Sequence, residues 1–120
     1  MSLVLAASLL AAQAAAPLAV DTPSKPLTME QQTAVRCSVA FALAAQRQKA
    51  GEGADPGWPD LSTRGREYFV RTMAQLMDET GVTRSGLAQY IQPETAALEA
   101  PGQLEQVMPS CLVMLEASGL

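Results

Sequence analysis

The two cysteines carry the most definite chemistry in this chain of 120 residues. Neither Cys37 nor Cys111 belongs to a Cys-x-x-Cys pair, which redox-active thiols usually need. Arg36 adjoins Cys37, but consecutive helical residues point in different directions, so this cation is poorly placed to activate the thiol. Paired cysteines are typical of exported proteins, and two cysteines allow one connectivity. We therefore predict a structural Cys37–Cys111 disulfide, with free buried thiols or a redox pair as alternatives.

Other catalytic residue types are sparse. The chain has no histidine, so it has no Ser-His or Cys-His pair and no imidazole metal ligand. It also lacks a Gly-x-Ser-x-Gly elbow and the spacings of common metal sites. Two facing carboxylates would suit a glycosidase, and the candidates are Asp55, Asp60, Glu67, Asp78 and Glu79. Nothing selects a pair, so we predict a non-catalytic protein without metal or cofactor, and an enzyme with convergent carboxylates is the third option.

Trp58 is the most suggestive single residue. It is the only tryptophan, and it lies between a glycine and a proline in a stretch rich in both. An aromatic side chain on a stiff loop can anchor a binding partner. The alternative is that Trp58 folds back as a lid over the core.

A basic cluster follows at the start of a predicted helix. Arg64, Arg66 and Arg71 lie where cations oppose the helix dipole, so they are candidate contacts for an anionic ligand or partner. The alternative is a solvated face paired with Glu67, Asp60 and acids of other helices. A nucleic acid partner is not expected, because the net charge is −4 and no aromatic residues are interleaved with the arginines.

The apolar residues suggest a second kind of binding site. Hydrophobic residues make up 48% of the chain but aromatic residues only 4%. Methionines are flexible gap-fillers in such cores. Phe41, Phe69, Met73 and Met108 are the candidates for a small apolar pocket among the helices.

The first 14 residues are interpreted as a signal peptide. No charged residue precedes Asp21, and the Ala-rich apolar run has the length of a signal core. In Ala12-Gln13-Ala14, the two alanines occupy the positions before the cleavage site at which signal peptidase requires small residues. Cleavage there would make Ala15 the new N-terminus. The alternative is an uncleaved anchor, because residues 3–20 just reach the length of a spanning helix. We expect cleavage, no stable membrane span afterwards, and a periplasmic or secreted location.

Helix signals dominate the remainder, which divides into an extended Pro-containing tail over 15–27 and a single helical domain over 28–120. No segment shows the alternation of a strand. We predict an all-α bundle of four to five short helices, the first tied to the last by the disulfide. The first helix is apolar nearly all round, which favours a central position. The first expected helix covers 29–49 and begins with a Thr28–Gln31 capping box. The second is capped by Ser62 or Thr63 and ends near Thr80. The third is capped by Thr83 and broken at Pro93, and the last covers 103–117 with a kink at Pro109.

The general build is similar to that of the small acid-stress chaperones of the bacterial periplasm. The resemblance lies in an exported, all-helical domain with one disulfide and rests on no shared motif, so it implies no particular residues. Our first interpretation is a non-catalytic interaction or envelope-stress module that binds another envelope protein. A bundle that binds a small apolar ligand is the second. The oligomeric state is left open.

Overall fold

Four α-helices make up the part of the protein, residues 26–120, that the computed structural model describes. They are α1 (Met29–Ala50), α2 (Arg64–Thr80), α3 (Ala88–Glu99) and α4 (Gln103–Ala117), with a 3-10 turn η1 (Ser85–Leu87) before α3. The predicted all-α class is confirmed, with four α-helices. The predicted signal peptide and all but the last two residues of the predicted tail lie outside the described residues.

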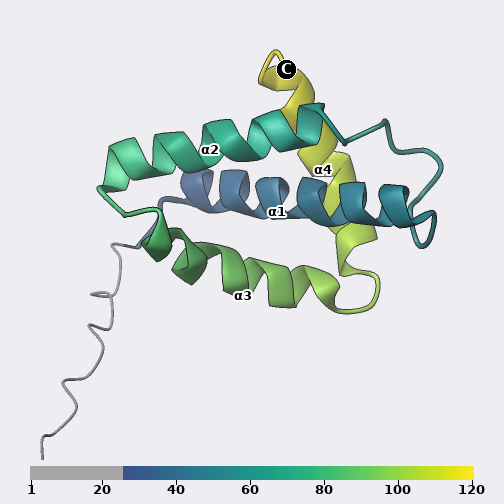
Figure 1. Ribbon diagram of the computed structural model, residues 1–120, viewed down its shortest axis with the longest axis horizontal. Helices are drawn as coiled ribbons and strands as arrows, with labels where there is room; N and C mark the ends of the chain where they lie inside the picture. The colour runs from purple at the N-terminus through teal and green to yellow at the C-terminus, as the bar shows by residue number, and fades with distance from the viewer. Residues whose placement is uncertain (1–25) are drawn as a thin grey trace, which may run out of the picture.

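Helix α1 is the centre of the bundle. It packs against each of the other three helices. Figure 1 shows α2 and α3 on opposite sides of α1 and α4 crossing behind it. This position follows from the sequence, because a helix whose middle is apolar on several sides needs neighbouring helices on those sides. The buried residues of α1 are Val35, Cys37, Ser38, Val39, Ala40, Phe41 and Ala44.

The ends of α1 are fixed by local chemistry. The Thr28 hydroxyl accepts a hydrogen bond from the Gln31 N–H at 3.1 Å, and Gln31 Oε1 accepts one from the Thr28 N–H at 2.9 Å. This reciprocal capping box satisfies two donors that a helix start leaves unpaired. Gly51 ends the helix with φ of 68°, a left-handed conformation that glycine adopts without a steric penalty.

Replacing Thr28 with alanine should lower the free energy of unfolding by about 1 kcal/mol, because the cap's hydrogen bond to the first turn of α1 is lost. Thr63 provides a matched control. It is the N-cap of α2, but its side chain makes no capping hydrogen bond. T63A should therefore change stability by less than about 0.5 kcal/mol. Urea denaturation of both variants measures the two changes in unfolding free energy. Equal losses of stability in T28A and T63A would contradict the capping role of the Thr28 side chain.

The disulfide is as predicted. Cys37 of α1 and Cys111 of α4 are bonded, and their side chains are only 1% and 2% exposed. Ion pairs reinforce the contacts between helices at the surface: Arg36–Glu94 joins α1 to α3, Arg47–Glu105 joins α1 to α4, and Arg64–Glu116 joins α2 to α4. Within residues 26–120, no helix is both long enough and apolar enough to cross a membrane.

The predicted break at Pro93 is wrong. Helix α3 runs through Pro93 without interruption. The proline ring is exposed on the outer side, whereas Leu98 on the inner side is 2% exposed in the core. Packing of the inner side therefore outweighs the hydrogen bond that proline cannot donate. Thr83 does bind the backbone just before α3, because its hydroxyl accepts a hydrogen bond from the N–H of Gly86 in η1 at 3.1 Å.

Candidate functional site

The predicted arginine cluster is divided between two roles. Arg64 Nε donates to the Leu120 carbonyl at 2.8 Å, and its Nη2 donates to Glu116 at 2.7 Å. Arg71 Nη1 donates to the Ser118 carbonyl at 3.0 Å. Arg64 and Arg71 therefore fasten α2 to the end of α4.

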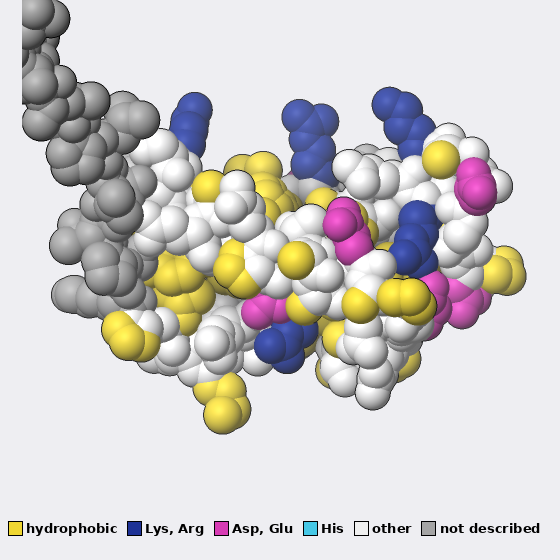
Figure 2. Space-filling view, turned by 90° about the horizontal axis from the view of Figure 1, so that it is seen from below, with side chains coloured by type: hydrophobic (Ala, Val, Ile, Leu, Met, Phe, Trp, Pro, Cys, Tyr) yellow, Lys and Arg dark blue, Asp and Glu magenta, His cyan; other side chains and the backbone are white. Residues whose placement is uncertain are grey.

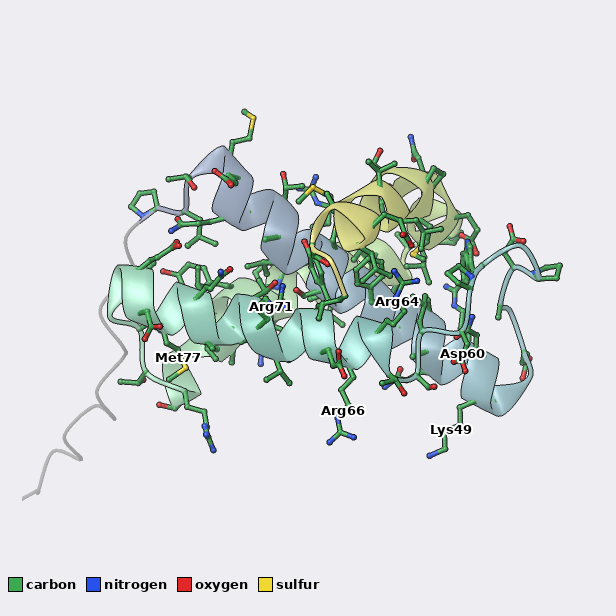
Figure 3. The ribbon with its side chains drawn as sticks, turned by 90° about the horizontal axis from the view of Figure 1, so that it is seen from above. Lys49, Asp60, Arg64, Arg66, Arg71 and Met77 are labelled. Carbon is green, nitrogen blue, oxygen red and sulfur yellow. A yellow bond between two sulfur atoms is a disulfide. The ribbon has the colours of Figure 1, made fainter. Side chains whose placement is uncertain are left out.

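Arg66 has a different environment. It points away from the helices, and Figure 3 shows Lys49, at the end of α1, projecting to the same side of the molecule. Among residues 26–120, neither side chain has a hydrogen bond or an ion pair. Figure 2 shows Lys and Arg side chains standing out from one edge of the molecule, clear of its surface. These two cations are available to a partner.

A groove lies between α1, the start of α2 and the loop that connects them. It consists of two adjoining hollows that share Ala42, Ala45 and Ser62. The inner hollow, of about 270 Å³, is also lined by Phe41, Leu61, Gly65, Arg66 and Phe69. The loop hollow, of about 780 Å³, is also lined by Gln46, Gln48, Lys49, Trp58 and Asp60. Arg66 and Lys49 thus both line the groove.

Close packing of α1 and α2 forms the floor of the inner hollow. At Gly65 a Cβ atom would lie 3.0 Å from the Phe41 Cβ and 3.3 Å from the Leu61 Cβ. Glycine at this position allows the two helices to approach. The Phe41 ring meets the Tyr68 ring edge-on with centroids 5.1 Å apart, which fixes its orientation.

Trp58 is half-buried and packs against the core from the loop hollow. Side chains from the last turns of α1 hold its loop. Gln48 Nε2 donates to the Pro59 carbonyl at 2.8 Å, and Gln48 Oε1 accepts from the Leu61 N–H at 3.0 Å. Arg47 Nη1 donates to the Gly53 carbonyl at 3.2 Å. Trp58 is therefore partly a lid, as the alternative interpretation held, and partly a wall of the groove.

The four residues of the predicted apolar pocket are not all in one place. Phe41 and Phe69 line the inner hollow. Met73 and Met108 are 6% and 0% exposed in the core and do not line it. Sequence reasoning missed one side of the groove, formed by α1. Its signal was a spacing of three, four and seven residues, which places one helix face at Ala42, Ala45, Gln46 and Lys49.

Among residues 26–120, the carboxyl groups of Asp60 and Glu105 have displaced pKa values, and both are lowered. The Asp60 carboxylate accepts hydrogen bonds from the backbone and side chain of Ser62, which lower its pKa. The backbone N–H of Glu105 itself, followed by Arg47, lowers the pKa of Glu105. A glycosidase acid requires the opposite shift. Within the described residues no three potential metal-ligating side chains come together. The Asp60 carboxyl group in the wall of the groove therefore lacks the raised pKa that a general acid of this kind has.

The lowered pKa of Glu105 predicts that the difference in free energy of unfolding between the wild-type protein and E105Q depends on pH. Because the native pKa is lowered from 4.5, the carboxylate stabilises the fold above that value, and this contribution is lost as the pH falls through the native pKa. E105Q should be less stable at about pH 7, and the gap should close towards about pH 3. Urea denaturation across this range measures it. E52Q, at an exposed loop glutamate, controls for loss of a charge, and a gap that does not change with pH would contradict the prediction.

No model of a known family, no curated protein and no solved structure matches this chain. Its function is therefore inferred from the residues of the groove.

Proposed function

We propose that this protein is an exported, non-catalytic helical module that binds another protein of the cell envelope through the groove. The observation that carries the proposal is the convergence of a half-buried tryptophan and two free cations on one apolar hollow surface. Aromatic and arginine side chains around a desolvated pocket are the residues that dominate binding at protein interfaces. Trp58 and Arg66 supply both types here.

Two features support export. The first 14 residues have the pattern of a signal peptide. The buried disulfide suits an oxidising compartment, since the cytosol keeps most thiols reduced. Both features agree with a periplasmic or secreted site of action. Sequencing the N-terminus of the purified native protein tests the cleavage, which should leave Ala15 first.

A small apolar ligand is the second candidate, favoured by the aromatic lining of the inner hollow. Its volume of about 270 Å³ is slightly below the range of about 300–1,000 Å³ typical of ligand sites. Met73 and Met108, which would have extended it, fill the core instead. A hollow of this size suits one large side chain of a partner better than an enclosed ligand.

Site-specific photocrosslinking in intact cells tests the function. A photoreactive amino acid at Gln46, which is exposed and lines the loop hollow, should give a discrete adduct with one envelope protein. The matched control is Val113, which is 68% exposed on α4 and outside the groove. The same substitution there should give no such adduct. Equal adducts at both positions, or none at either, would contradict binding through the groove.

A further inference from the structure

The groove has an apolar strip that its two hollows share, and each hollow is lined by one of the two free cations. Ala42 and Ala45 form the strip that both hollows share, Arg66 belongs to the inner hollow and Lys49 to the loop hollow. Lys49 follows Ala42 by seven residues, two helical turns, so it lies about 10 Å further along the same face of α1. An occupant that spans both hollows therefore meets both cations.

The carboxylate in the wall of the groove forms no ion pair with these cations in the described part of the chain. Asp60 accepts the Ser62 N–H at 2.9 Å, and no ion pair joins it to Lys49 or Arg66 in the described part of the chain. Charge complementarity therefore favours negative groups on the occupant. The apolar strip and the aromatic floor favour hydrocarbon between those groups.

We infer that the occupant is an amphipathic helical segment of the partner, with a large apolar side chain in the inner hollow and acidic residues against Arg66 and Lys49. The inference rests on the proposed function and specifies the chemistry of its partner. A helix that lays its apolar face into a groove is a common mode of peptide recognition. The strip of α1 from Ala42 to Lys49 is two helical turns long, which leaves room for about two turns of such a helix alongside it.

An anionic membrane surface is a poorer fit to the same cations. Membrane-surface helices present apolar side chains that protrude into the lipid, whereas the apolar side chains here line hollows. Phosphatidylglycerol vesicles are therefore included in the test as the competing occupant.

Trp58 provides a built-in reporter, because it is the only tryptophan and lies in the groove. The probe is a synthetic peptide of about 18 residues with a leucine and phenylalanine stripe at helical spacing, flanked by glutamates and without tryptophan. Its twin carries lysine in place of every glutamate. We expect a saturable change in Trp58 fluorescence with the acidic peptide, weakened by salt, and none with the basic twin.

Charge reversal at Arg66 makes the test specific. R66E should weaken binding of the acidic peptide by about fivefold, the equivalent of about 1 kcal/mol, and should bind the basic twin better than the wild-type protein does. R84E is the matched control, since Arg84 is exposed after the end of α2 and does not line the groove. It should bind the acidic peptide like the wild type.

Several results would overturn the inference: no binding of the acidic peptide, equal losses in R66E and R84E, or a response to phosphatidylglycerol vesicles in place of the peptide. Circular dichroism of each variant confirms that it is folded. A crosslink from Gln46 to an envelope protein, together with no peptide binding, would keep the proposed function and reject this partner chemistry.

Discussion

Replacing Cys37 and Cys111 together with alanine should lower the free energy of unfolding by about 4.5 kcal/mol. The bond joins residues 74 positions apart, and the chain-entropy treatment of a closed loop of that length gives this value. The bond contributes chiefly by restricting the unfolded chain. Domains of this kind have total stabilities of about 5–15 kcal/mol, so the variant should be near its folding limit. Urea denaturation at equilibrium measures the loss.

Two controls separate the covalent bond from the packing of its side chains. Reducing the wild-type protein should reproduce most of the loss without changing any residue. The double variant should also show a larger dependence of unfolding free energy on urea, because its unfolded chain exposes more surface. A double variant within about 1 kcal/mol of the wild type would mean that α1 and α4 are held by packing alone.

Replacing Phe41 with alanine should cost about 3–5 kcal/mol, the range for truncating a fully buried aromatic side chain. Phe41 is 0% exposed, and its ring packs against Tyr68. Its Cβ also lies close to Gly65, where a side chain on α2 would have no room. Truncation therefore leaves a cavity where Gly65 of α2 packs closely against α1. Urea denaturation of the oxidised protein gives the change in free energy.

Phe41→Leu should lose much less than Phe41→Ala, because leucine refills most of the volume. Val70→Ala is the surface control, since Val70 is 61% exposed on α2 and should change stability by less than about 0.5 kcal/mol. A Phe41→Ala variant that unfolds like Val70→Ala would show that the contact between α1 and α2 does not depend on this ring.

Local signals in the sequence predicted much of the fold. The start of α1 follows from hydrogen bonds within the Thr28–Gln31 box, and its end follows from Gly51. The disulfide follows from two cysteines and an expected oxidising compartment. The predicted helix break at Pro93 was wrong. The sequence shows that proline loses one hydrogen bond, but it does not show the packing of Leu98 that outweighs this loss.

The candidate site was less predictable because it depends on contacts between distant residues. Arg64, Arg66 and Arg71 look alike in the sequence, yet the first and last are satisfied by groups of residues 116–120. Only three-dimensional packing shows that Arg66 is left free. Likewise, Phe41 lines the groove and Met108 does not, although both are fully buried apolar residues.

The hydrogen bonds from Arg47 and Gln48 that hold the loop of Trp58 have a kinetic consequence. The loop has little conformational freedom left to lose, so an arriving molecule meets a surface that is already organised. Association then needs no prior rearrangement, and its rate should lie in the ordinary range for proteins of about 10⁵–10⁷ M⁻¹ s⁻¹. Differences in affinity among groove variants should accordingly appear mainly as differences in residence time.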